Sequence, residues 1–189
     1  MSLAARSRAR QRLGRLVDRL RGAQNVDSLR AGGASVGHNV RLAQPAWVDP
    51  AFVWLISIGD DAILGPGVQV IAHDASTKRL TGYTLMRPVK IGARVYIGAS
   101  AIILPGVSIG DDAIVGAATV VRDDVPAGTM VVGNPGRVVG QVSDYAARHL
   151  AAMPERPVHD VAGLRLLDAS DAEKRRMRGE LEKGPGYVR

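Results

Sequence analysis

The feature that most limits how this chain can fold is an aliphatic residue that returns at every sixth position. From Ile91 the frame continues without a slip to Val121, and a glycine often follows the aliphatic residue. The frame occupies positions 36, 42 and 48, then 58, 64 and 70, then 91, 97, 103, 109, 115 and 121. A short fixed period of this kind is typical of solenoids, in which each repeat packs only on its neighbours.

The period itself determines the geometry of the solenoid. Six residues suffice for one short strand and one corner, and three such units close a triangular coil. Successive coils stack at the parallel-strand spacing of about 4.8 Å, so the aliphatic positions form inward-facing ladders. Gly, Asn and Asp suit the corners, where positive φ or local hydrogen bonds are needed. A narrow interior also explains why aromatic residues make up only 4% of the chain. We therefore predict an all-β solenoid, a parallel β-helix over residues 31–140.

Two breaks in the frame indicate where the coil is interrupted. Val48 to Ile58 spans ten residues instead of twelve, which predicts one shortened or rebuilt corner. Val70 to Ile91 spans 21 residues, three more than a full coil, and we assign the excess to a polar loop over residues 75–88. Loops that interrupt a rigid scaffold are where binding and catalytic residues concentrate.

The charge of the chain, +7 overall, lies mainly before the coil. Residues 1–30 hold eight arginines and two aspartates, whereas residues 31–140 hold eight basic and eight acidic residues. Leucine and valine at helical spacing between 13 and 20 predict a basic amphipathic helix. That helix either packs its leucine face on the protein or, through residues 1–24, lies on an anionic membrane surface. Nucleic acid is not expected as a partner, because the neutral coil adds no recognition motif.

The segment after the coil, residues 141–189, has the signals of a helical extension. Ser143 predicts the start of a helix that ends near Met153, and Ser170 with Glu173 forms a capping-box pattern. The chain has no cysteine, which excludes disulfides, thiolate zinc sites and a cysteine nucleophile. No apolar run reaches the roughly 18–20 residues that span a bilayer, and no signal-peptide pattern is present. We expect a cytoplasmic protein.

One histidine of four stands at a break in the frame. His73 directly precedes the predicted loop, where a neutral imidazole could take a proton from a hydroxyl group near neutral pH. The structural alternative is that His73 only closes a corner. A metal site is not expected, because the coils supply no second or third ligand close to this histidine.

Residues 36–140 resemble the hexapeptide-repeat acyltransferase family. Residues 71–78, Ile-Ala-His-Asp-Ala-Ser-Thr-Lys, are similar to the active-site segment of sugar O-acetyltransferases from polysaccharide and lipopolysaccharide clusters. Residues 97–107 are similar to the stretch that lines the acetyl-CoA groove, and residues 132–138 to a Gly-x-Pro-x-[Lys/Arg] signature. The resemblance implies a left-handed coil and a homotrimer with its sites between adjacent prisms.

The resemblance also implies an activity, transfer of an acetyl group from acetyl-CoA to a hydroxyl of a sugar or glycan precursor. His73 would be the general base, no acyl-enzyme would form, and Asp74 is the nearest candidate to orient the imidazole. Matching residue by residue places acetyl-CoA along Gly98, Ala99, Gly116 and Ala117, with Arg122 and Arg137 toward its phosphates. The loop would contact the acceptor through Lys78, Arg79 and Tyr83.

Two positions depart from the family pattern. Relatives often have Ser/Thr-Lys-Asp where this chain has Arg122-Asp123-Asp124, which displaces the basic residue by one position. Gly67 stands where galactoside and maltose acetyltransferases carry an acceptor-binding asparagine, so these acceptors are not favoured. Two alternative functions stay open at this point: an N-acetyltransferase that acts on an amino sugar, and a non-catalytic trimeric scaffold.

Overall fold

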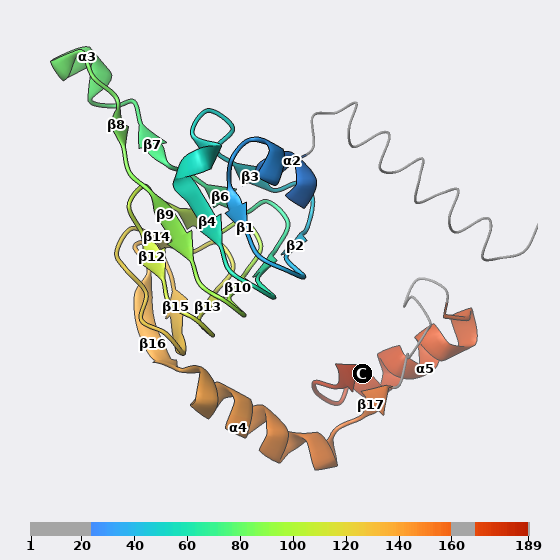
Figure 1. Ribbon diagram of the computed structural model, residues 1–189. Coiled ribbons are helices and arrows are strands. Elements are labelled where there is room, and N and C mark those ends of the chain that lie inside the picture. Colours follow the sequence, from blue (N-terminus) through green and yellow to red (C-terminus); the bar gives the residue numbers. More distant parts are fainter. Residues whose placement is uncertain (1–23, 160–168, 189) are drawn as a thin grey trace, which may run out of the picture. The chain divides into compact units, whose positions relative to one another are not determined.

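The computed structural model describes residues 24–159 and 169–188 (Figure 1). Its internal contacts divide the chain into two units, Met1–Val142 and Ser143–Arg189. The basic amphipathic helix predicted before residue 24 lies outside the described residues. Among the residues that are described, no helix is both long and apolar enough to cross a membrane.

The first unit is built from three parallel sheets, and each turn of the chain contributes one strand to each sheet. Sheet A contains β1 (Ser35–Val36), β4 (Ile56–Ile58), β9 (Val89–Ile91) and β12 (Ser108–Ile109). Sheet B contains β2 (Arg41–Leu42), β5 (Ile63–Leu64), β10 (Tyr96–Ile97), β13 (Ile114–Val115) and β15 (Thr129–Val132), with β16 (Arg137–Gln141) antiparallel at its end. Sheet C contains β3 (Trp47–Val48), β6 (Gln69–Val70), β11 (Ile102–Ile103) and β14 (Val120–Val121). We number the coils 1 to 4 in chain order.

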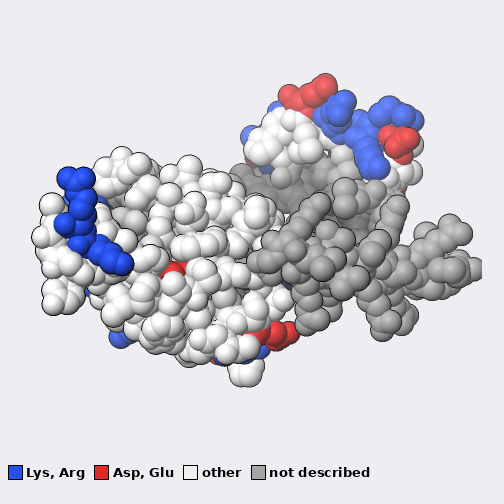
Figure 2. Space-filling view, turned by 90° about the horizontal axis from the view of Figure 1, so that it is seen from above, with Lys and Arg blue, Asp and Glu red and all other residues white. Residues whose placement is uncertain are grey.

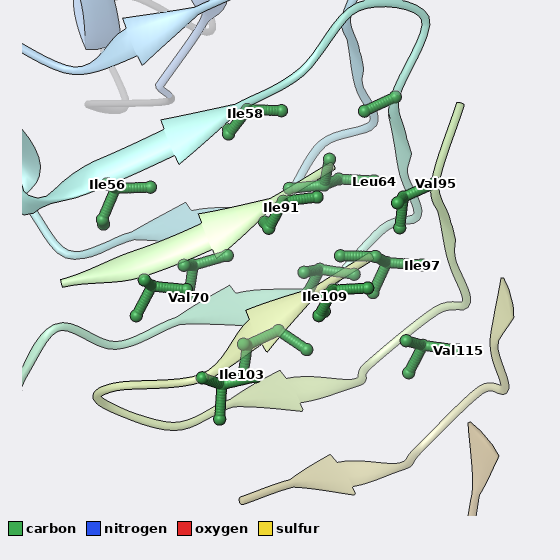
Figure 3. Packing of buried hydrophobic residues seen from close by; sticks show 14 of the residues in the cluster. Ile56, Ile58, Leu64, Val70, Ile91, Val95, Ile97, Ile103, Ile109 and Val115 are labelled. Atoms are coloured by element: carbon green, nitrogen blue, oxygen red, sulfur yellow. The ribbon is translucent and has the colours of Figure 1, made fainter. Parts of the chain in front are cut away.

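The register of these sheets confirms the sixfold frame. In sheet A, Ile58 pairs with Val36 and Ile91, and in sheet C, Val70 pairs with Val48 and Ile103. Of the twelve positions in the frame, ten are buried. Figure 3 shows the aliphatic stack that includes Ile58, Ile97 and Val115. Only Val36 and Leu42 of coil 1 are partly buried. A core of β-branched and leucine side chains stacked in this way leaves little space for rings.

The corners explain why the chain turns every six residues. The residue three positions after an inward aliphatic repeatedly has positive φ. At several corners this residue is not a glycine, and these cases are Asn39, Asp61, Arg94, Ser100, Asp112 and Ala118. The left-handed conformation is uncommon for residues with a side chain, so the regular stacking imposes it at these corners.

The first break is a rebuilt corner, as predicted, but it is lengthened rather than shortened, and the second break is larger than predicted. Val48 and Ile58 lie in successive sheets of the coil, where the regular spacing is six residues, so their spacing of ten includes an insertion. Val70 and Ile91 are likewise one corner apart, so the insertion holds 15 extra residues rather than three. The spacing alone does not show whether a break spans a whole coil, whereas the strand pairing places each break in a single corner.

The first insertion contains the short helix η1 (Val53–Leu55), and the second contains a projecting hairpin. Its strands β7 (His73–Asp74) and β8 (Leu85–Met86) pair antiparallel, and the one-turn helix α3 (Lys78–Thr81) forms the tip (Figure 1). The predicted loop over residues 75–88 is therefore ordered as the outer part of this hairpin.

Each end of the coil is covered. Helix α2 (Val26–Ala31) begins with a capping box between Asn25 and Ser28 and buries Leu29 on coil 1. The side-chain amide of Gln24 pairs with the backbone of Val48: Nε2 donates to its carbonyl and Oε1 accepts from its N–H, both at 2.6 Å. At the far end, β16 turns back against β15.

The second unit is helical with one small sheet. It includes α4 (Val142–Ala152), η2 (Met153–Glu155), β17 (Val158–His159), α5 (Asp171–Leu181) and β18 (Tyr187–Val188). The two strands pair in parallel. The capping box predicted for Ser170 and Glu173 is present, with Ser170 Oγ accepting from the N–H of Glu173 at 3.2 Å.

Candidate functional site

The imidazole of His73 is paired with a buried carboxylate that sequence analysis did not identify. Asp49 follows β3 directly in coil 1, and His73 begins β7 in the corner after coil 2. Nδ1 of His73 contacts Oδ2 of Asp49, whose side chain is fully buried, whereas the imidazole is 27% exposed. Asp49 also accepts from the backbone N–H groups of Ala51 and Ala72, each at 3.1 Å. Three donors thus satisfy this carboxylate in the interior.

This contact determines which imidazole nitrogen is available for chemistry. An ionised carboxylate only accepts hydrogen bonds, so Nδ1 carries the hydrogen and Nε2 keeps its lone pair. A carboxylate that holds an imidazole in one tautomer and stabilises the imidazolium is the arrangement used in proton-abstracting sites. The partly exposed ring can therefore present Nε2 to a hydroxyl group at the surface.

The expectation that Asp74 orients the imidazole is wrong. β7 is still a strand at this point, with His73 opposite Met86 and Asp74 opposite Leu85, and neighbours on a strand point to opposite faces. Oδ1 of Asp74 instead accepts the backbone N–H of Ser76 at 2.8 Å. That hydrogen bond lowers the pKa of the Asp74 carboxyl from its usual range.

The three residues expected to contact the acceptor lie on the projecting hairpin. Lys78 and Arg79 belong to α3, and Tyr83, which is 79% exposed, follows it. Figure 2 shows basic side chains gathered on the left, at the tip of the hairpin that carries α3. The hydroxyl of Thr77 donates to the carbonyl of Tyr83 at 2.8 Å and closes the tip. Within the described part of the chain, no hydrogen bond or ion pair joins these three residues to His73.

The small residues expected to line the donor groove share one edge of the prism. Gly98 and Ala99 follow β10, and Gly116 and Ala117 follow β13, so all four stack where sheet B turns into sheet C. The N–H of Ala118 donates to the carbonyl of Ala99 at 2.8 Å. In the described residues, the N–H groups of Ala99 and Ala117 have no protein acceptor. Two donors one coil apart are therefore free to bind a ligand.

Close stacking provides a separate reason for one of these glycines. A Cβ added to Gly98 would lie 2.5 Å from the backbone nitrogen of Ala117 and 2.8 Å from the carbonyl carbon of Gly116. Gly98 is therefore required by the approach of the next coil, whether or not a ligand binds there.

The two arginines expected near the donor phosphates are brought together around one aspartate. Nε of Arg122 lies 3.2 Å from Oδ2 of Asp123, and Nη1 of Arg137 lies 3.7 Å from the same oxygen. All three side chains are well exposed. Two guanidinium groups share one carboxylate, which leaves net positive charge and free donors for an anionic ligand.

The parts of the candidate site occupy two different edges of a single prism. His73 lies in a corner that leads from sheet C to sheet A, and so does Arg122 after β14. Ala99 and Ala117 lie on the edge between sheets B and C. Within residues 24–159 and 169–188, no group of three or more His, Cys, Asp or Glu side chains is arranged to hold a metal ion.

Asp49 is the functional candidate that the repeat pattern did not reveal. It follows the inward residue Val48 at the start of the first break, and its partner lies 24 residues later in the second break. The available signal was positional: both residues stand where the frame is interrupted at the same edge of the prism.

Comparisons with known proteins identify relatives of the coil. A family model described as bacterial transferase hexapeptide (six repeats) matches residues 88–123. Nodulation protein L of Rhizobium meliloti (strain 1021) is 45% identical over 111 residues, which cover 55% of this chain and 61% of that protein. For four curated relatives, the aligned region covers between 46% and 61% of the relative's own length, about half.

Solved structures match over a larger share. A maltose O-acetyltransferase from Clostridium difficile 630 is 32% identical with a TM-score of 0.50, covering 61% of this chain and 73% of that one. A hexapeptide-repeat-containing acetyltransferase from Vibrio cholerae O1 biovar eltor, complexed with acetyl coenzyme A, is 26% identical with a TM-score of 0.50. That match covers 74% of this chain and 90% of the other.

Proposed function

Since this chain belongs to the hexapeptide-repeat acyltransferase family, we propose that it transfers an acetyl group from acetyl-CoA to a hydroxyl of a sugar or glycan precursor. The observation that carries this proposal is the pairing of His73 with the buried carboxylate of Asp49. It supplies an imidazole with one nitrogen fixed by a hydrogen bond and the other open to a substrate. The names of the relatives support an acetyl donor and a sugar acceptor.

In the proposed step, Nε2 of His73 removes the proton of the acceptor hydroxyl while its oxygen attacks the thioester carbonyl carbon of acetyl-CoA. The new C–O bond forms, the C–S bond breaks, and coenzyme A leaves as a thiolate that takes up the proton from the imidazolium. Asp49 stabilises the imidazolium between these events. No covalent acyl-enzyme is needed, which suits a chain without cysteine.

The donor would lie along the edge formed by Gly98, Ala99, Gly116 and Ala117. The free N–H groups of Ala99 and Ala117 suit the amide carbonyls of an extended pantetheine arm. Arg122 and Arg137 suit the phosphate groups, for which guanidinium is a strong partner.

A homotrimer, which the family resemblance implies, belongs to the proposal. His73 and the edge with Ala99 lie on different corners of one prism, so the base of one chain would face the donor edge of a second copy. The flat sides of three prisms would close such an arrangement, with a left-handed coil in each. The hairpin residues Lys78, Arg79 and Tyr83 would then contact the acceptor from a neighbouring copy.

A cytoplasmic location is part of the proposal, since acetyl-CoA is an intracellular donor. Residues 1–24 would hold the enzyme to the inner face of the membrane, where seven arginines meet anionic lipid headgroups.

The decisive experiment follows thiol release from acetyl-CoA with a panel of sugars, for the wild-type protein and for His73→Gln. His38→Asn is the control, because His38 is an exposed corner histidine. We expect the rate with sugar to fall at least about a hundredfold in His73→Gln, the usual range for a general base, with coenzyme A affinity retained.

The same experiment separates the alternatives. An acetyl group that mild alkali removes is an ester and supports O-transfer, whereas a resistant amide would indicate an N-acetyltransferase. Failure to bind coenzyme A in calorimetry would favour a non-catalytic scaffold. Near wild-type turnover by His73→Gln would disprove the role of the base.

A further inference from the structure

The corner between coils 1 and 2 carries an aromatic pair for which the transfer step has no use. The ring centroid of Phe52 lies 4.9 Å from that of His73, with the planes inclined at 48°. The ring of Phe52 also lies 5.5 Å from that of Trp54, which is 57% exposed. Phe52 thus lies between the candidate base and the indole. Tryptophan is usually highly buried, so an exposed indole one ring away from a candidate base points to a surface that contacts a ligand.

The pair is held in place by the turn that follows α2. A Cβ at Gly32 would lie 2.6 Å from Cγ1 of Val53, and a Cβ at Gly33, which has a φ of +99°, would lie 3.2 Å from Cβ of Trp54. Only a turn without side chains can approach η1 so closely. Val53 is buried, so the backbone that carries the exposed indole is anchored on the core.

The order of features along the prism places this pair on the acceptor side of the base. The corner after coil 1 holds Phe52 and Trp54, the corner after coil 2 holds His73, and the corner after coil 4 holds Arg122. The arginine end suits the phosphates of the donor, so a thioester that reaches His73 approaches from that end. That order leaves the end where the aromatic pair lies for the acceptor hydroxyl.

We propose that Phe52 and Trp54 form a stacking wall for a pyranose ring. The ring would lay its face of C–H bonds on the indole of Trp54 and direct a hydroxyl toward Nε2 of His73. The electron-rich face of an aromatic ring attracts the slightly positive C–H bonds, and both surfaces leave water on contact. This inference rests on the proposed O-acetyltransferase function, because it uses the same base. It selects cyclic sugars over open-chain polyols, which offer hydroxyls without a rigid apolar face.

The chain allows a direct optical test, because Trp47 and Trp54 are its two tryptophans. Trp47→Phe leaves Trp54 as the reporter, and its fluorescence is titrated with the methyl pyranosides of galactose, glucose, mannose and N-acetylglucosamine, and with sorbitol. We expect a saturable change with at least one pyranoside and none with sorbitol. No change with any pyranoside, or an equal change with sorbitol, would overturn the proposal.

A kinetic test uses the pyranoside that is bound. Trp54→Ala should raise the KM for that acceptor about tenfold, while the KM for acetyl-CoA changes less than about twofold. The matched control is Trp47→Ala, which removes an exposed tryptophan from sheet C in coil 1. An unchanged KM for the acceptor would overturn the proposed stacking role of Trp54. So would a loss of oligomer mass in the Trp54→Ala variant, measured by light scattering, because Trp54 would then belong to a contact between subunits.

The two proposals fail in different ways. The titration is repeated with His73→Gln combined with Trp47→Phe, which removes the base and keeps the indole. If this variant binds the pyranoside but the wild-type protein acetylates no sugar, the transfer function fails and the stacking wall stands. If the wild-type protein acetylates a pyranoside that leaves Trp54 fluorescence unchanged, the wall fails and the function stands.

Discussion

Nδ1 of His73 donates to Oδ2 of Asp49, a carboxylate from the corner one coil earlier that has no exposed surface. The pairing requires that two separate insertions in the sixfold frame meet at one edge of the prism. The base is therefore oriented by the stacking of coils rather than by its neighbours in sequence.

The first prediction concerns this carboxylate. Asp49→Asn should lower kcat by about 10²- to 10⁴-fold, because an amide no longer stabilises the imidazolium or fixes its tautomer. Coenzyme A affinity should remain, since the donor edge is separate. Steady-state kinetics and calorimetry measure the two effects. Asp74→Asn provides the comparison, and a larger loss of kcat in that variant than in Asp49→Asn would contradict the assignment.

The second prediction concerns the close approach of coils 3 and 4. Gly98→Ala places a methyl group within 2.8 Å of two backbone atoms of the next coil. The overpacking should cost about 1–3 kcal/mol in the free energy of unfolding, a fall of several degrees in Tm. Thermal denaturation followed by circular dichroism measures it. Gly140→Ala is the control, because its Cβ would meet no atom within 4 Å, and equal Tm values for the two variants would refute the steric argument.

The third prediction concerns the two arginines around Asp123. Arg122→Gln and Arg137→Gln should each weaken coenzyme A binding about three- to tenfold, a modest loss because both side chains are exposed. The effect should be smaller for dephospho-coenzyme A, if the guanidinium groups contact the 3′-phosphate. Calorimetry with both ligands provides the comparison. Lys90→Gln removes an exposed charge on sheet A. An equal loss of coenzyme A affinity in this variant would indicate a general effect of positive charge instead of a contact with the two arginines.

The fourth prediction concerns an exposed ion pair that links corners of coils 3 and 4. Nε and Nη2 of Arg94 donate to the two carboxylate oxygens of Asp112 at 2.6 and 2.7 Å, and this lowers the pKa of Asp112. A lowered folded pKa stabilises the protein above the unfolded value, about 3.9, and the benefit is lost as the pH falls through the folded pKa.

Asp112→Asn should therefore lower Tm slightly at pH 7 and have a smaller effect near the acid limit of folding. Asparagine tolerates the positive φ of this position, so the substitution removes charge without straining the corner. Denaturation curves of both proteins at several pH values test this. A difference in Tm between the wild-type protein and Asp112→Asn that grows as the pH falls would contradict the prediction.

The fifth prediction concerns the arginine-rich segment before the coil. Replacing its arginines with glutamine should reduce co-sedimentation with vesicles of phosphatidylcholine and phosphatidylserine, at about 1 kcal/mol per residue close to the surface. The residues are Arg6, Arg8, Arg10, Arg12, Arg15, Arg19 and Arg21. Wild-type binding should weaken near 1 M salt, where the Debye length is about 3 Å. Unchanged sedimentation would leave the alternative in which the leucine face packs on the protein.

The sequence predicted the coil well because its signal is periodic. Ile91, Ile97 and Ile103 each repeat the same inward environment, so a frame of six positions determines both the strands and their register. The insertions carry no such repetition. The pairing of Val70 with Ile103 and of Ile58 with Ile91 determines how long each insertion is.

The candidate site was only partly predictable for the same reason. His73 was identified because it stands at a break, but the partner of its Nδ1 atom depends on which segment stacks beneath it. Proximity in sequence suggested Asp74, whereas the alternation of side chains along β7 directs that residue elsewhere. The pairing of Phe52 with Trp54 was likewise not predictable, because an aromatic pair in a corner has no periodic signature.

The amide of Gln24 has a consequence for how the molecule behaves at high concentration. A stack of parallel strands ends in a row of unsatisfied backbone groups, which is a template for another chain and for fibre growth. In sheet C that last position is taken by a side chain that satisfies both the N–H and the carbonyl of Val48. One glutamine thus occupies, in sheet C, the backbone groups with which a strand of another chain would pair.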